Sequence, residues 1–278
     1  MSAAAGVAAA LVLGAVYAYG TNWIPFIYLN FLLTIGFGLA VAAAVEWGAR
    51  VGKMRNTAVA TMVAAVVGLI AVYFAWVFDP MARVDIVDRP IWDLQVLWQY
   101  MKLGFQNGFW GIGENGPPVT GWMLVGVWAT EAIVIVTVVV LVVRRMLGNR
   151  PFCEETNQWT KSEKGVALLS LVGDVDIDAK LSRLVQGELD ALSEFYRGAA
   201  AEPATLRLDL ATCPGCPTCN FLTAKLVRLV ENKRGKTTPQ EQTLWQNLQI
   251  APEDVAKVRS AGVERPAAPP PAEATTEG

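Results

Sequence analysis

Four stretches of the chain are apolar over a length that matches a lipid bilayer, and this feature constrains the fold more than any other. The hydrocarbon core of a bilayer is about 30 Å thick, and an α-helix crosses it with about 20 apolar residues. A helix also satisfies its own backbone hydrogen bonds, which is required because lipid tails offer no hydrogen-bond partners. We therefore predict four transmembrane helices, at Ala3–Tyr19, Ile24–Val45, Thr57–Phe78 and Trp122–Val143.

The charged residues are concentrated after residue 144, so the chain joins two differently solvated parts. Of its 278 residues 53% are hydrophobic and only 17% are charged, which is unusual for a soluble domain. The net charge of −2 gives no reason to expect nucleic-acid binding. We predict a four-helix transmembrane domain at 1–150, a small cytoplasmic α+β domain at 151–262 and a disordered Pro/Ala-rich tail at 263–278.

Basic residues indicate the side of the membrane that each loop faces. They lie between the second and third spans and after the fourth span, at Arg50, Lys53, Arg55, Arg144, Arg145 and Arg150. Such residues favour the cytoplasmic side. The first span has no basic residue ahead of it, so we interpret it as a retained span and not as a cleaved signal peptide. The pattern predicts a multi-pass protein of the cell (inner) membrane with both termini in the cytoplasm.

Small residues recur at every fourth position in three of the predicted spans. Such stripes let neighbouring helix backbones approach closely, so we predict a tightly packed bundle. The stripes are Gly6, Ala10, Gly14 and Ala18 in the first span, Gly36, Ala40, Ala44 and Gly48 in the second, and Ala60, Ala64 and Gly68 in the third.

Residues 79–120 are too long for a simple connection and are rich in aromatic residues. From Ile91 to Gln106 apolar and polar residues recur on opposite faces of a helix, which predicts an amphipathic helix outside the cytoplasm. Its Trp92 and Trp98 rings favour the membrane interface. This segment is expected to anchor the bundle as a lid, or to dock a lipid or a partner protein.

A single acid, Glu131, interrupts the fourth span near its middle. A carboxylate is costly there unless it is protonated, hydrogen-bonded or hydrated. Depth counted from the outer face predicts Asn30 and Thr34 of the second span as its polar partners. Glu131 either locks the bundle through hydrogen bonds or handles a proton or cation, and the second role would belong to a proton-coupled transporter.

The 151–262 domain shows the patterns of a soluble α+β fold. Ser162–Leu171 and Ile177–Tyr196 are predicted as helices. Alternating leucines at 206, 208 and 210 predict a half-buried strand. Two further strands are predicted at Phe221–Val230 and Thr243–Ile250, and a last short helix begins at Pro252.

All four cysteines belong to this domain: Cys153, Cys213, Cys216 and Cys219. Three of them form the motif CPGCPTC between two predicted strands. In a reducing cytoplasm such clustering favours a metal site over a disulfide. Four thiolates would complete a tetrahedral zinc site.

The order of strand, cysteine knuckle and strand over roughly residues 205–250 resembles zinc ribbons. It differs from their pattern because Cys153 is followed by Glu154, Glu155 and Thr156 where a second Cys-x2-Cys pair would be expected. Three cysteines spaced in this way with a remote fourth one also hold iron–sulfur clusters. A thiol redox pair and a domain without any cofactor are the other interpretations.

The chain contains no histidine, which excludes Ser-His-Asp and Cys-His catalysis and every imidazole-containing metal site. The leading hypothesis is therefore not an enzyme. It is an integral membrane scaffold or adaptor whose cytoplasmic, zinc-stabilised domain docks a partner protein. The alternatives are a membrane redox component with a cysteine-ligated iron–sulfur cluster or thiol pair, and a proton-coupled transporter that uses Glu131.

Overall fold

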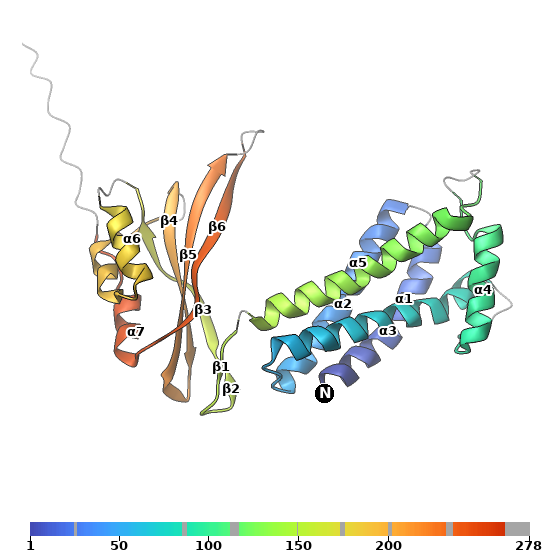
Figure 1. Cartoon of the computed structure of the whole chain (residues 1–278), viewed down its shortest axis with the longest axis horizontal. Coiled ribbons are helices and arrows are strands. Elements are labelled where there is room, and N and C mark those ends of the chain that lie inside the picture. Colours follow the sequence, from blue (N-terminus) through green and yellow to red (C-terminus); the bar gives the residue numbers. More distant parts are fainter. Residues whose placement is uncertain are drawn as a thin grey trace, which may run out of the picture. The chain divides into compact units, whose positions relative to one another are not determined.

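The structure is a computed structural model that describes residues 1–24, 27–84, 88–111, 117–148, 150–172, 176–199, 202–231 and 236–264. The chain divides into two compact units, Met1–Gly148 and Asn149–Gly278. The first unit is helical and the second is rich in strands (Figure 1). Most of the tail predicted at 263–278 lies outside the described residues.

Within the described residues, four helices of the helical unit are long and apolar enough to cross a membrane. This result confirms the four long apolar helices that the sequence predicts. Each helix continues beyond its predicted C-terminal end, because a helix need not stop where its apolar residues stop. The helices are α1 (Ser2–Trp23), α2 (Ile27–Val51), α3 (Thr57–Arg83) and α5 (Gly121–Gly148).

The predicted stripes of small residues lie at helix contacts in α1 and α3 but not throughout α2. The buried small residues of α1 are Gly6, Ala10, Gly14 and Ala18. In α2, a Cβ added to Gly36 would have nothing within 4 Å, whereas one added to Gly38 would lie 3.1 Å from Val138 of α5. The predicted α2 stripe therefore lies at a helix contact at Gly48, where an added Cβ would be 2.8 Å from Ser2 of α1, but not at Gly36, since composition does not fix which face of an apolar helix turns inward.

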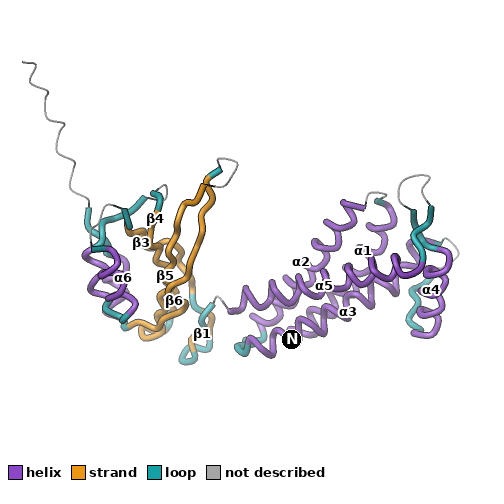
Figure 2. The backbone as a smooth tube through the Cα atoms, turned by 45° about the horizontal axis from the view of Figure 1, so that its top comes forward, coloured by secondary structure: helices purple, strands orange, loops and turns teal. Residues whose placement is uncertain are grey.

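A shorter helix, α4 (Leu94–Asn107), lies across the ends of α3 and α5 (Figures 1 and 2). It is the amphipathic helix that the 79–120 pattern predicts. The Asp93 carboxylate caps it by accepting hydrogen bonds from the backbone N–H groups of Gln95 and Val96. Leu97 and Gly104 are buried, whereas Trp98 is 67% exposed. One face of α4 thus packs on the bundle and leaves large apolar side chains on its outer surface.

The strand-rich unit is built on one antiparallel sheet of order β3-β4-β5-β6. Its strands are β3 (Lys161–Ser170), β4 (Ala204–Cys213), β5 (Cys216–Glu231) and β6 (Thr237–Ile250). A second, two-stranded sheet pairs β1 (Phe152–Cys153) with β2 (Gln158–Trp159). The predicted strands correspond to the middle of β4 and to the C-terminal parts of β5 and β6.

Three short helices cover one face of the larger sheet: α6 (Ile177–Val185), the 3-10 helix η1 (Leu189–Glu194) and α7 (Pro252–Arg259). The alternating leucines of β4 are buried against this layer, where Leu184, Leu192 and Phe195 meet them. Burial of each such side chain contributes roughly 1.5–3 kcal/mol relative to exposure. The core therefore lies between the sheet and these helices, and the cysteines form a separate buried cluster.

Two predictions for this unit are wrong, and glycines explain both. Residues 162–171, predicted as a helix, fall almost entirely within β3, whose alternation is broken by a bulge between Glu163 and Ala167. Gly165 in that bulge has φ +64 and donates its N–H to the Asp209 carboxylate at 2.7 Å. The predicted helix 177–196 is interrupted at Gly187, whose φ of +93 ends α6.

Candidate metal centre

The four cysteines reach one place from two separate parts of the strand-rich unit. Cys213 ends β4 and Cys216 begins β5, and the two are register partners across the hairpin turn. Cys219 follows on β5. Cys153 ends β1, far away in the sequence. The hairpin and β1 together therefore build the cluster that the CPGCPTC motif predicts.

Three of the four sulfur atoms are close enough to share one ion. The Sγ atoms of Cys153, Cys216 and Cys219 all lie within 4.8 Å of one another, so these residues could hold a metal. Zinc–thiolate bonds of about 2.3 Å place tetrahedral ligands about 3.8 Å apart. The Cys153 and Cys219 Sγ atoms are 2.8 Å apart, so they would have to separate by about 1 Å around an ion.

Cys213, the fourth predicted ligand, stands outside this group of three. It is buried beside Cys153 and Cys216, and its Sγ lies 3.0 Å from the Thr156 hydroxyl. The structure therefore brings three predicted ligands together and leaves Cys213 beside them, in contact with Cys153 and Thr156.

An acidic residue that the sequence did not single out as a ligand lies next to the cluster. Glu155 Oε2 is 2.8 Å from Cys216 Sγ, and Glu155 Oε1 accepts a hydrogen bond of 3.1 Å from the Thr218 hydroxyl. That hydroxyl is 3.0 Å from Cys216 Sγ. The only sequence signal for Glu155 is its position two residues after Cys153, and its approach to Cys216 depends on how β1 and β2 fold.

The hydrogen bonds within the cluster shift the pKa values of two of its thiols in opposite directions. Burial alone would raise the pKa of the Cys153 thiol, but hydrogen bonds with Cys219 and Thr156 outweigh it and lower this pKa to about 6. The same hydrogen bond with Cys153, reinforced by burial, raises the pKa of Cys219. Cys153 is therefore the more acidic thiol of the pair. Thiolates are soft ligands that suit zinc, copper(I) and iron–sulfur clusters.

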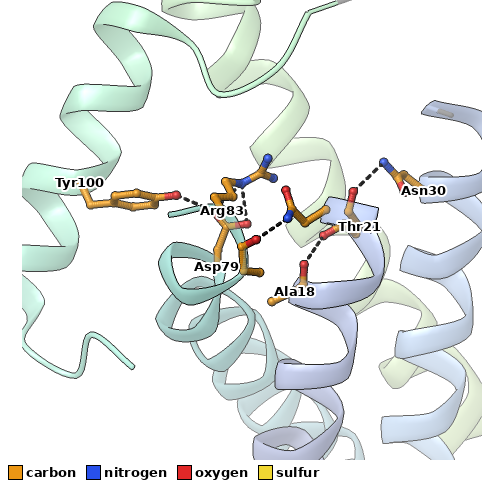
Figure 3. A network of polar contacts seen from close by, with 8 residues as sticks. Ala18, Thr21, Asn30, Asp79, Arg83 and Tyr100 are labelled. Atoms are coloured by element: carbon orange, nitrogen blue, oxygen red, sulfur yellow. Dashed lines mark hydrogen bonds and ion pairs between the residues drawn. The ribbon is translucent and has the colours of Figure 1, made fainter. Parts of the chain in front are cut away.

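The polar residues predicted inside the helical unit lie in two different surroundings. Asn30 Nδ2 donates to the backbone carbonyls of Thr21, at 3.3 Å, and Ile24, at 3.2 Å, and so joins α2 to the end of α1 (Figure 3). The Thr34 hydroxyl lies 2.9 Å from the Tyr17 hydroxyl and donates to the carbonyl of Asn30. Both residues thus stabilise the contact between α1 and α2.

Glu131 has charged neighbours at the end of α3, since it interacts electrostatically with Asp79 and Arg83. Arg83 Nε lies 2.9 Å from each Asp79 carboxylate oxygen, and the Tyr100 hydroxyl of α4 donates to the same carboxylate at 2.9 Å (Figure 3). Sequence reasoning missed this cluster because it ended the third span at Phe78. The i, i+4 spacing of Asp79 and Arg83 was the signal for a helix that continues.

Comparison with protein-family models, curated proteins and solved structures finds no match to this chain. Its function is therefore inferred from its own residues.

Proposed function

We propose that this chain is an integral membrane adaptor whose four long helices span the bilayer and whose strand-rich unit binds zinc in the cytoplasm and docks a partner protein. The observation that carries the proposal is the group of three sulfur atoms, from Cys153, Cys216 and Cys219, within 4.8 Å of one another. Three sulfurs this close form a ligand set for a soft cation, and zinc suits thiolate ligands in a reducing compartment.

The outer surface of the helical unit supports its place in a bilayer. Many large apolar side chains on the long helices are more than half exposed, which water would penalise and lipid would accommodate. They include Val12, Val16, Leu32, Met62, Leu69, Ile133 and Leu141.

Aromatic and basic residues at opposite ends of the helices support the orientation. Exposed Trp23, Tyr28 and Trp122 lie at the end of α1 and the starts of α2 and α5. The basic residues lie where α2 and α5 end. Ser2 donates to the Val45 carbonyl at 3.0 Å, so the start of α1 lies beside the end of α2. The positive-inside tendency then places both termini and the cysteines in the cytoplasm.

The sheet offers an edge for a partner protein. β6 is the last strand of the sheet, is 14 residues long, and is exposed over most of its length. Long edge strands present unpaired backbone groups to which another chain can add. A metal that fixes β1 against the β4–β5 hairpin would keep the sheet rigid enough to present this edge.

Metal analysis of the purified full-length chain in detergent tests the proposal. We expect one zinc per chain, loss of zinc in Cys216→Ser and retention of zinc in Ser193→Ala, a control in η1. A photo-crosslinker at Gln242 of β6 should form a defined protein adduct in cells, and Cys216→Ser should abolish it. A wild-type chain without metal would overturn the zinc site, and an unchanged adduct in Cys216→Ser would overturn its link to docking.

One observation favours a second function, a membrane redox component. The 2.8 Å separation of the Cys153 and Cys219 sulfurs brings two thiols close to bonding distance. Thiol trapping in intact cells followed by mass spectrometry separates the two functions. A Cys153–Cys219 disulfide in the metal-free chain would favour the redox role, whereas zinc with four reduced thiols would contradict it. Iron in place of zinc would favour an iron–sulfur cluster.

A further inference from the structure

The sequence leaves three roles open for the segment that contains α4: a lid on the bundle, a docking surface for lipid, and a docking surface for a partner protein. α4 runs across the ends of α3 and α5 and not along them (Figures 1 and 2). With 14 residues it is about 21 Å long, which is too short to cross a hydrocarbon core of about 30 Å. α4 therefore lies at the rim of the bundle, and its exposed side chains decide its role.

The exposed apolar side chains of α4 form two separate stripes. Successive residues of a helix are rotated by about 100°, and the buried stripe of α4 runs through Leu97 and Gly104. About a quarter turn to each side of it lies one pair of exposed apolar side chains, Leu94 and Trp98 on one flank and Val96 and Leu103 on the other. These four side chains are between 46% and 69% exposed. α4 is therefore apolar on both flanks and not only on the side that packs on the bundle.

The polar residues of α4 lie opposite its buried stripe and face away from the bundle. They are exposed, and they are Gln95, Gln99, Lys102 and Gln106. Lys102 is the only charged residue in the α4 sequence. A helix with a polar outer side, apolar flanks and a positive charge suits the boundary between hydrocarbon and water, where the phosphates of lipid headgroups lie.

The Trp98 flank of α4 is continuous with the exposed apolar surface of α5. The Phe105 ring, on the same flank, meets the Trp122 ring edge-on at the start of α5, with ring centroids 5.9 Å apart. Trp122 is 81% exposed and its neighbour Met123 is 60% exposed. Tryptophan favours the interface between lipid and water. A protein that docked on α4 would cover one face of it, whereas a bilayer surrounds both flanks at one depth.

We infer that α4 is seated in the headgroup layer of a phospholipid bilayer, with both apolar flanks against acyl chains and its polar side toward water. This inference rests on the proposed function, since it requires that the long helices span a bilayer. α4 then fixes how deeply the bundle sits. Because the Tyr100 hydroxyl of α4 donates to Asp79, the Asp79–Arg83 pair lies at the same level, where charged groups cost less than in hydrocarbon.

Photo-crosslinking of the full-length chain in phosphatidylcholine vesicles tests this placement. A benzophenone amino acid replaces one residue at a time, at Trp98 on one flank, Leu103 on the other, or Gln99 on the polar side. Mass spectrometry then detects adducts with lipid. We expect lipid adducts at positions 98 and 103 and loss of the adduct at position 99, which is the matched control because it is exposed on the same helix. Position Ile133, 64% exposed on α5, reports whether the long helix itself contacts lipid.

The results at the four positions separate this inference from the proposed function. Lipid adducts at position 133 without adducts at positions 98 and 103 would overturn the placement of α4 and leave the membrane-spanning helices standing. Equal lipid labelling at positions 98, 99 and 103, or a defined protein adduct at position 98 in cells, would also overturn the placement. Absence of lipid adducts at position 133 would overturn both.

Discussion

The Asp79 cluster of the helical unit and the cysteine cluster of the strand-rich unit are held together in different ways. In the helical unit, Asp79 is neutralised by Arg83 and receives a further hydrogen bond from Tyr100. In the strand-rich unit, the cysteines form hydrogen bonds with one another and with Glu155, Thr156 and Thr218, all of which are acidic or neutral. The first cluster supplies its own cation, whereas the second gathers groups that attract one. The difference teaches that the first cluster is complete within the chain, whereas the second is one that could take a metal ion.

The largest effect should follow removal of the ion from the strand-rich unit. Zinc binding to thiolate sites contributes on the order of 10 kcal/mol of apparent free energy in small domains, and much of it is folding free energy. We expect a strong chelator to make residues 150–172 of the full-length chain sensitive to protease while the long helices stay resistant. Mass spectrometry of the fragments measures this. Chelator preloaded with zinc is the control. Equal protection from protease with and without chelator would contradict a role of the ion in holding the strand-rich unit together.

A second test removes the internal acceptor from the helical cluster. Asp79→Ala leaves Arg83 and the Tyr100 hydroxyl without their shared acceptor. The side chains of Asp79 and Arg83 are only 14% and 21% exposed. We therefore expect a loss of about 2–3 kcal/mol in the free energy of unfolding in micelles. Asp88→Ala is the matched control, because its ion pair with Arg89 is almost fully exposed and should contribute about 0–0.5 kcal/mol. Equal losses of unfolding free energy in the two variants would show that the Asp79 cluster does not stabilise the helical unit.

A third test asks how tightly α4 is packed onto that cluster. A Cβ at Gly104 would collide with the Phe109 ring, which itself stacks on Tyr100 with ring centroids 4.6 Å apart. We expect Gly104→Ala to destabilise the helical unit by about 1–3 kcal/mol. Gly126→Ala on α5 is the control, since a Cβ there meets nothing within 4 Å and should stabilise the helix by about 0.5–1 kcal/mol. Thermal unfolding followed by circular dichroism compares the two variants.

The smallest expected effect concerns an ion pair on the open face of the sheet. Burial alone would raise the pKa of Glu241, but hydrogen bonds from Lys225 and Arg207 lower it below its ordinary value. A lowered folded-state pKa stabilises the protein above the unfolded pKa of about 4.3, and this contribution disappears as the pH falls through the folded pKa.

Because Glu241 is partly exposed, solvent screening should keep this contribution below about 1 kcal/mol. Denaturant titrations of the wild type and Glu241→Gln at pH 6 and at pH 3 measure it. We expect the wild type to be more stable at pH 6 and the difference to vanish at pH 3. A difference that grows on acidification would contradict the assignment.

The sequence predicted the elements that are marked by a long apolar or amphipathic stretch. It missed the elements whose conformation or end is decided by one or two residues. The four long helices follow from the length of their apolar stretches, and α4 follows from its amphipathic spacing. β3 was missed because the bulge at Gly165 breaks the alternation of its side chains. The end of α3 was missed because Asp79 and Arg83 are polar, although their pairing lets the helix continue.

The candidate site was predictable only where its residues are adjacent in the sequence. Cys213, Cys216 and Cys219 form a visible motif, and Cys153 joined the prediction as the one remaining cysteine. Nothing local separates the three close sulfurs from Cys213, since that depends on the hydroxyl of Thr156. The contact of Glu155 with Cys216 spans 61 residues and arises only when β1 and β2 are folded.

The bulge at Gly165 also decides how the sheet can associate with other chains. It lies in β3, one of the two outer strands, and bends that side so that a flat neighbour cannot continue the ladder there. The opposite side at β6 has register shifts of its own beside Asn247, whose φ is +54, and its long regular pairing with β5 runs only from Thr237 to Thr243. With irregular pairing on both outer strands, the sheet leaves only a short regular border, which limits how far stacked copies of the domain could extend it into a fibre.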